Sequence, residues 1–459
     1  METSTKWSGV TGAKLLLQPW LRILLCFLLF YCLLHAHLCS SADSLSSGQS
    51  LTGNQTIISS GGIFELGYFS LGNRSRYYIG IWYKKVPVDN LLWVANRDSP
   101  LPDSKAEFKI SKDGNLVIQA QSRSLVWSTN LTAKSSSRAA VLLDNGNLVL
   151  RDHGSSSNSV VWDSFSYPTN SWVPGQRLGL NKATKYNQVL TSWKNLQDPS
   201  SGLYSLKIDP NGTAQILLLW KRTQQYWTTG LWDGHIFGKV PEMRGSPINF
   251  PFTSNENVSY FTYIVKVENA IYFRYVVDYT GQVKLFIWAK GRVQWLNFWV
   301  GPAEDQICSV YGLCGAFGVC NRENLNHCQC LSGFEPASFT DWELNDWSGG
   351  CRRKKKLGCG SDQFALQTGM RLASNVSVAT VAESAEGCRS ACLKACSCTA
   401  YSYQHSKCSL WKGDLFNLQL LSDGSGDDIY IRLAELETLN NETTKKQQPT
   451  ALINRGAIG

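Results

Sequence analysis

The residues of this chain that are best suited to covalent chemistry are its cysteines. The 459-residue sequence holds 15 of them. Twelve lie between Cys308 and Cys408, three lie near the N-terminus at Cys26, Cys32 and Cys39, and none lies in between. An even, crowded set of cysteines predicts a disulfide framework, which forms in oxidising, extracellular compartments. We therefore expect a cysteine-free first part followed by a disulfide-stabilised second part.

The N-terminal segment predicts the same compartment. Basic residues from Lys6 to Arg22 precede the apolar stretch 23–34, and small residues follow at 40–42. This order is typical of a signal peptide, which we place at residues 1–41. A signal anchor is the alternative, but about twelve apolar residues are too few to span a bilayer of about 30 Å.

Seven Asn-x-Ser/Thr sequons support an extracellular chain, because each can carry a glycan where it faces solvent. The predicted sites are Asn54, Asn73, Asn130, Asn211, Asn257, Asn375 and Asn441. The formal net charge is +9 for the whole sequence, of which the leader carries +2 (Lys6, Lys14, Arg22 and Glu2), so +7 remains after its removal. This charge favours contact with acidic cell-wall polymers or acidic peptides, although a mildly basic solvated surface accounts for it as well. We expect no nucleic-acid partner for a secreted chain.

Enzymatic chemistry lacks the residues that it needs. Only four histidines follow the leader, and none lies in a metal-spaced pair: His153, His235, His327 and His405. Cys328-x-Cys330 is too short a spacing for zinc. The chain has no Gly-x-Ser-x-Gly elbow and none of the kinase motifs. We expect no enzyme, no catalytic residue, no metal and no cofactor.

The elements of the first part repeat along the chain. Gly114-Asn115-Leu116-Val117 recurs 32 residues later as Gly146-Asn147-Leu148-Val149. Trp93, Trp127 and Trp162 each follow two aliphatic residues at similar intervals. A period of about 34 residues is also found in helical repeats, but the short β-branched segments between turns favour strands. We predict a threefold β-prism with the three tryptophans packed inside.

Five short motifs follow one another along the chain: Trp93-Val94-Ala95-Asn96-Arg97-Asp98, Trp162-Asp163-Ser164-Phe165, Thr191-Ser192-Trp193-Lys194, Asp198-Pro199-Ser200-Ser201-Gly202 and Gly230-Leu231-Trp232-Asp233-Gly234. In sequence and order they resemble the motifs of plant bulb-type (G-type) lectins, specifically the ectodomains of S-locus glycoproteins and S-receptor-like kinases. The resemblance covers residues 44 to about 433.

The resemblance implies a mainly β, multidomain fold. Its expected parts are a bulb-type lectin β-prism at 42–165, a second, lectin-like S-locus β domain at 166–303, an EGF-like module at 304–351, and a small α+β PAN/apple module at 359–433. Residues 434–459 are polar and hold no transmembrane helix or kinase domain. Either the chain is a secreted form, or it ends where the membrane span of a receptor kinase would begin.

Bulb lectins bind mannose through a Gln-x-Asp-x-Asn-x-Val-x-Tyr strand. The first degenerate match retains Asp113, Asn115 and Val117, whereas the outer Gln and Tyr are replaced by Ser111 and Gln119. The second match retains only Asn147 and Val149 and has Asn145 in place of the Asp. Loss of these polar ligands removes most of the affinity for a sugar. We predict hairpin turns here rather than a mannose site.

The family resemblance also implies a disulfide pairing that spacing alone leaves open. For the EGF-like series it implies Cys308–Cys320, Cys314–Cys328 and Cys330–Cys351. For the PAN/apple series it implies Cys388–Cys408, Cys392–Cys398 and Cys359–Cys396. A helix from Cys388 to Cys398 would place Cys388 and Cys392 on one face, joined to the sheet. The acidic pattern of calcium-binding EGF modules is absent, so we expect no calcium.

The resulting functional prediction is an extracellular recognition module in the apoplast, or at the cell surface if the chain is a truncated receptor. The resemblance implies a secreted peptide or cell-wall glycan as ligand, recognition of pollen, and another S-receptor-like kinase ectodomain as partner in a homo- or heterodimer. The alternatives are a carbohydrate-binding lectin and the outer half of a serine/threonine receptor kinase.

Overall fold

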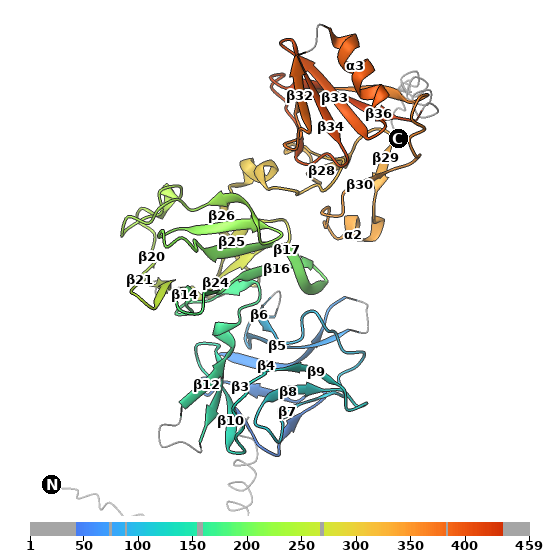
Figure 1. Cartoon of the computed structure of the whole chain (residues 1–459). Coiled ribbons are helices and arrows are strands. Elements are labelled where there is room, and N and C mark those ends of the chain that lie inside the picture. The colour runs from blue at the N-terminus through green and yellow to red at the C-terminus, as the bar shows by residue number, and fades with distance from the viewer. Residues whose placement is uncertain are drawn as a thin grey trace, which may run out of the picture.

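The structure is a computed structural model that describes residues 43–72, 76–87, 90–153, 159–266, 270–381 and 384–434. The predicted signal peptide, residues 435–459 of the polar tail, and the sequons Asn73 and Asn441 lie outside these ranges. Among the described residues, regular secondary structure is mostly β-strand with few helical turns, which confirms the predicted mainly β fold class. Figure 1 shows three groups of strands that follow one another from the N-terminal to the C-terminal part.

The first group is a β-prism of three antiparallel four-stranded sheets. One sheet consists of β3 (Thr56–Ile58), β4 (Phe64–Ser70), β5 (Tyr77–Tyr83) and β6 (Leu91–Val94). The second consists of β2 (Ser50–Leu51), β7 (Glu107–Ile110), β8 (Leu116–Gln119) and β9 (Leu125–Ser128). The third consists of β1 (Ser44–Ser46), β10 (Arg138–Leu142), β11 (Leu148–Asp152) and β12 (Ser159–Asp163).

The three repeated tryptophans meet inside this prism, as predicted. The ring centroids of Trp93, Trp127 and Trp162 lie 5.9–6.0 Å apart, and every pair is edge-to-face. Each such pair adds about 0.5–1.5 kcal/mol to the stabilisation from burial. One tryptophan from each sheet therefore ties the three sheets together.

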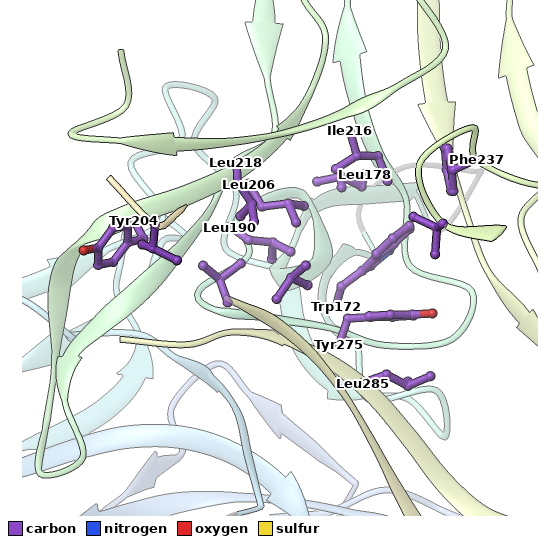
Figure 2. Packing of buried hydrophobic residues seen from close by; sticks show 14 of the residues in the cluster. Trp172, Leu178, Leu190, Tyr204, Leu206, Ile216, Leu218, Phe237, Tyr275 and Leu285 are labelled. Carbon is purple, nitrogen blue, oxygen red and sulfur yellow. The ribbon is translucent and has the colours of Figure 1, made fainter. Parts of the chain in front are cut away.

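The second group has the same plan, with three four-stranded antiparallel sheets around one apolar core (Figure 2). One sheet consists of β16 (Leu190–Asn195), β17 (Asp198–Ile208), β18 (Ile216–Trp220) and β19 (Gln224–Thr228). Another consists of β13 (Ser171–Trp172), β24 (Ala270–Val277), β25 (Val283–Ala289) and β26 (Leu296–Gly301). The last consists of β15 (Tyr186–Asn187), β14 (Leu178–Asn181), β22 (Val258–Phe261) and β21 (Phe252–Ser254). A small pair, β20 (Ile248–Asn249) and β23 (Ile264–Val265), lies beside them.

The cysteine-rich part contains one eight-stranded sheet. In spatial order its strands are β28 (Cys328–Cys330), β27 (Gly318–Cys320), β35 (Leu418–Leu420), β31 (Gln363–Arg371), β36 (Asp427–Leu433), β33 (Cys398–Gln404), β34 (Lys407–Lys412) and β32 (Val378–Val381). The remaining elements are the pair β29 (Phe334–Pro336) and β30 (Cys351–Arg353), and the helices α2 (Phe339–Glu343) and α3 (Ala385–Lys394).

This sheet joins the two cysteine series, which the sequence analysis treated as separate modules. Strand β27 pairs in parallel with β35, placing Val319 opposite Leu418. Both residues belong to one buried core, together with Trp411 of β34. The two halves therefore share hydrogen bonds and apolar packing.

The helix of the last part, Ala385–Lys394, is displaced toward the N-terminus relative to the predicted Cys388 to Cys398. It begins after Ser384, whose hydroxyl accepts a hydrogen bond from the backbone N–H of Gly387, and it ends at Lys394. Cys398 opens the strand β33 instead. The predicted face is present, because Cys388 and Cys392 are both fully buried against the sheet.

Candidate functional site

The first degenerate mannose motif forms a hairpin turn. Gly114 has φ of +85°, and its backbone N–H bonds to the carbonyl of Ser111 at 2.8 Å. Asp113 accepts hydrogen bonds from the Ser111 hydroxyl and from the Asn115 amide. These bonds lower the pKa of the Asp113 carboxyl below its ordinary value. Its oxygens are thus engaged by neighbours in the same turn.

Asn115 is buried and belongs to the same turn network. Its Oδ1 accepts hydrogen bonds from the Thr129 hydroxyl at 2.9 Å and from the Leu131 backbone N–H at 2.6 Å. Its Nδ2 donates to the Leu131 carbonyl at 3.2 Å. Val117 is also buried. The polar groups that would bind a sugar hydroxyl therefore connect β8 to the segment after β9.

The second motif repeats this arrangement. Asn147 Oδ1 accepts hydrogen bonds from the Ser164 hydroxyl at 3.0 Å and from the Phe165 backbone N–H at 3.1 Å. Asn145 Oδ1 accepts the Asn147 backbone N–H at 3.0 Å, and Val149 is buried. These hydrogen bonds support the prediction that Asn145 and Asn147 form turns.

Arg97, from the Trp-Val-Ala-Asn-Arg-Asp motif, joins the two prisms. Its buried guanidinium donates to the backbone carbonyls of Pro199 at 2.8 Å, Thr191 at 3.0 Å and Ser192 at 2.6 Å. Burial lowers the pKa of Arg97 to about 10, and Asp98 beside it acts in the opposite direction. The group stays charged at physiological pH, so the three bonds are charge-assisted.

Asp98 adds a second connection next to the first. Its carboxylate accepts the Ser201 backbone N–H at 2.6 Å and the Ser201 hydroxyl at 3.0 Å. On another side of the boundary, the rings of Tyr83 and Tyr272 stack with centroids 4.3 Å apart. The Tyr83 hydroxyl also donates to the carbonyl of Phe273 at 3.1 Å. These contacts hold the prisms in a defined relative position.

A groove of about 740 Å³ lies between the prisms. We call it the tryptophan groove after Trp82 of the first prism and Trp193 and Trp295 of the second. The indole Nε1 of Trp193 is buried and has no hydrogen-bond partner among the described residues. Leu196 at its edge is 54% exposed. The groove thus offers large aromatic surfaces from both prisms.

Charged groups of both signs line the tryptophan groove. The Arg274 guanidinium lies 4.7 Å from the ring centroid of Trp295 and donates to the carbonyl of Leu91 at 2.8 Å. Asp278 pairs with Lys284. Burial, aided by Asp278, raises the pKa of the neighbouring Tyr279, which therefore stays a neutral hydroxyl. The walls consequently combine apolar contact with fixed polar positions.

A second groove, of about 670 Å³, runs along the other side of the same boundary. We call it the tyrosine groove after Tyr167, Tyr186 and Tyr260. Tyr167 and Tyr186 are each about half exposed, and the Arg177 guanidinium lies 4.7 Å from the Tyr260 ring centroid. The motif residues Asn145, Asn147 and Val149 line its first-prism side.

The structure brings together all six expected cysteine pairs, with Cα–Cα distances of 5.2–5.7 Å. They are Cys308–Cys320, Cys314–Cys328, Cys330–Cys351, Cys359–Cys396, Cys388–Cys408 and Cys392–Cys398. Two of these bridges attach α3 to β33 and β34.

The described sequons fall into two classes. Asn54, Asn130, Asn211 and Asn257 are exposed. Asn375 is half-buried, and its Nδ2 donates to the carbonyl of Asp414 at 2.6 Å. Because a glycan is attached to that same nitrogen, the structure favours modification at the first four sites.

The described residues contain no group of three or more His, Cys, Asp or Glu positioned to hold a metal ion. Within the same ranges, no helix is long and apolar enough to cross a membrane. Neither groove was predicted from the sequence. The sequence feature that comes nearest to indicating them is that Arg97 and Trp193 lie in motifs typical of the family.

Three family profiles match separate parts of the chain. The profile of the D-mannose binding lectin matches residues 90–194, that of the S-locus glycoprotein domain matches 227–338, and that of the PAN-like domain matches 359–418. The EGF-like assignment of residues 304–351 stays a prediction.

Full-length relatives decide the family. The S-locus-specific glycoprotein BS29-2 of Brassica oleracea var. alboglabra is 36% identical over 406 residues, which cover 86% of this chain and 92% of the relative. The chain belongs to the S-locus glycoprotein family. A G-type lectin S-receptor-like serine/threonine-protein kinase of Arabidopsis thaliana is 42% identical over 94% of this chain and 53% of its own length. This S-locus glycoprotein family chain thus spans about half of that kinase.

Among solved structures, a monomeric mannose-binding lectin from Gastrodia elata is 23% identical. The likeness covers 27% of this chain and 94% of that lectin, with a TM-score of 0.21.

Proposed function

We propose that this member of the S-locus glycoprotein family is an extracellular recognition module that binds a secreted peptide in the tryptophan groove. The observation that carries the proposal is the composition of the groove walls. Trp82, Trp193 and Trp295 come from both prisms, and the Arg274 guanidinium lies against the Trp295 ring. Tryptophan and arginine dominate the binding energy of protein interfaces, so these walls suit a peptide better than a sugar alone.

The fixed position of the prisms supports the same proposal. Arg97 and Asp98 connect the domains through side chain to backbone contacts, which do not depend on the identity of the residues contacted. A groove preformed by such contacts loses little conformational entropy when a ligand binds. Ligand specificity then depends on the residues that line the groove, which is what recognition of a secreted signal, including one from pollen, requires.

Carbohydrate binding is the second candidate, and we assign it to the tyrosine groove. The observation in its favour is that the exposed Asn145 lines a groove with two half-exposed tyrosine rings, whereas the amide of Asn147 is already bonded within its turn. An aromatic ring can pack against the apolar face of a sugar while amides bond its hydroxyls. The ligand would then contact both prisms rather than the mannose site of a single sheet.

The receptor-kinase relatives support a further part of the proposal, in which the module is the ligand-binding part of a serine/threonine receptor kinase and pairs with a similar ectodomain. A transcript whose reading frame continues past Gly459 into an apolar span and a kinase domain would establish this arrangement. A stop codon directly after Gly459 would favour a secreted protein.

One pair of screens tests the proposed ligand class. The secreted, disulfide-bonded chain is presented in parallel to a displayed peptide library and to a glycan array. We expect the library to yield peptides that carry aromatic or acidic residues and bind with micromolar or better affinity. Binding restricted to the array would overturn the peptide proposal and favour the tyrosine groove.

A further inference from the structure

A cavity of about 250 Å³ lies within the second prism, away from both grooves. Figure 2 shows Trp172, Leu206, Ile216, Phe237, Tyr275 and Leu285, which line it, in the middle of the apolar cluster. All six are at least nine-tenths buried. Protein interiors are close-packed and hold few voids larger than a water molecule, so ordinary packing of a β-prism does not require a space of this size.

The opening of the cavity has a different character from its interior. Phe298 of β26, 58% exposed, and the half-buried Met243 lie at the opening beside Glu242. Methionine adapts its shape to irregular apolar contacts. An apolar interior that ends in a flexible, partly exposed rim permits entry of a small molecule.

Glu242 is the one charged side chain that lines the cavity in the described part of the chain. Its Oε1 accepts a hydrogen bond from Trp299 Nε1 at 2.9 Å, which holds the carboxylate at the rim. The Thr229 hydroxyl is already engaged, because it accepts the Ile216 N–H and donates to the Gly230 carbonyl. Ser246 and Tyr275 also line the cavity, so Glu242 is its charged contact for a ligand rather than its one polar contact.

We propose that this cavity binds a small cationic amphiphile, whose apolar chain or ring occupies the interior and whose protonated amine pairs with Glu242. The apolar lining selects for the chain through removal of its surface from water. The single carboxylate at the rim selects against anions such as fatty acids, since no lysine, arginine or histidine lines the cavity. The site uses none of the groove residues, so it stands independently of the proposed peptide function.

Three probes with the same chain test the proposal: octylamine, octan-1-ol and octanoate. Their dissociation constants are measured by calorimetry at pH 6 on the intact secreted protein. We expect octylamine to bind at least tenfold more tightly than octanoate, with octan-1-ol between them. Shortening the amine to hexylamine should weaken binding about fourfold per methylene removed.

Two variants test whether Glu242 at the cavity opening causes the preference for octylamine over octanoate. Glu242→Gln keeps an oxygen for Trp299 but removes the charge, so the preference for octylamine over octanoate should fall to within about threefold. Glu256→Gln, an exposed residue in the turn between β21 and β22, is the matched control and should leave the preference unchanged. Equal binding of all three probes to the unsubstituted protein, or an equal loss in both variants, would overturn the proposal, as would no binding of any probe.

Discussion

The guanidinium of Arg97 donates a hydrogen bond to the backbone carbonyl of Pro199 at 2.8 Å, across the boundary between the two prisms. Arg97 belongs to the lectin-type motif, and Pro199 lies at the start of β17. The Trp-Val-Ala-Asn-Arg-Asp motif of the first prism therefore also holds the second prism in place. Both grooves lie along this boundary, so their shape depends on it.

Replacing Arg97 with alanine should destabilise the attachment. The change leaves the buried carbonyls of Thr191, Ser192 and Pro199 without a donor, and we expect a loss of about 2–4 kcal/mol in the free energy of unfolding. Denaturant titration followed by tryptophan fluorescence measures it. Arg76→Ala is the control, because Arg76 pairs with Asp198, which lies next to Pro199 in β17, but the Arg76 side chain is partly exposed. This variant should lose under about 1 kcal/mol in the free energy of unfolding. Similar small losses in both variants would show that Arg97 does not hold the prisms together.

Acid should destabilise the last module through Asp362 and Arg432, a buried pair with Nε and Oδ2 2.9 Å apart. Burial by itself raises the pKa of Asp362, but hydrogen bonds from Gly358, Cys359 and Arg432 outweigh it and lower the pKa below 3.8. Since the folded pKa lies below the unfolded value of about 3.9, the stabilisation is complete above that value and is lost as the pH falls through the folded pKa.

Asp362→Asn tests this pair at pH 6 and at pH 3. We expect a loss of roughly 3–5 kcal/mol at pH 6, because an unpaired buried Arg432 remains, and a smaller difference from the unsubstituted protein at pH 3. Thermal unfolding at both values measures it, with the exposed Asp427→Asn as control. A loss that is the same at both pH values would contradict the role of the Asp362 charge.

Much of the fold followed from local patterns in the sequence. The interval between Trp93, Trp127 and Trp162 predicted the first prism because each repeat places the same ring in the core. The second prism has no such repeat, since its sheets draw strands from distant parts of the chain: β13 pairs with β24 some 100 residues later. The pairing of β27 with β35 was missed for the same reason.

The grooves were beyond sequence reasoning because their walls come from both prisms. Trp82 and Trp193 lie far apart in the chain, and contacts across the boundary such as those of Arg97 bring them to one groove. In contrast, the turn role of Asp113 was predictable, because its bonds are to Ser111 and Asn115 in the same turn.

Mild reduction should unfold the two cysteine series together and before the first prism. Each disulfide contributes roughly 2–4 kcal/mol, and all six lie in this part of the described chain. The shared sheet couples both halves, so a protease should cut residues 304–433 in one phase while residues 43–165 stay intact. Limited proteolysis with increasing dithiothreitol checks this order. Separate phases for 304–351 and 359–433 would argue against coupling through β27 and β35.

Glycosylation should be lowest at Asn375 among the five described sequons. Attachment of a glycan to its Nδ2 would break the bond to the Asp414 carbonyl and place a bulky group against a half-buried site. Peptide mapping by mass spectrometry, after enzymatic glycan removal, measures the occupancy of each site. Asn54, Asn130, Asn211 and Asn257 serve as internal controls. Full occupancy at Asn375 would contradict the structural assignment.

The most direct test of the account is the affinity of a selected peptide for two matched variants. Trp193→Ala removes an aromatic wall of the tryptophan groove, whereas Tyr186→Ala removes a half-exposed ring from the tyrosine groove. The account predicts at least a tenfold weaker Kd for Trp193→Ala, about 1.4 kcal/mol or more, and a change under threefold for Tyr186→Ala. The reverse pattern, or full affinity in the Trp193→Ala protein, would contradict recognition in the tryptophan groove.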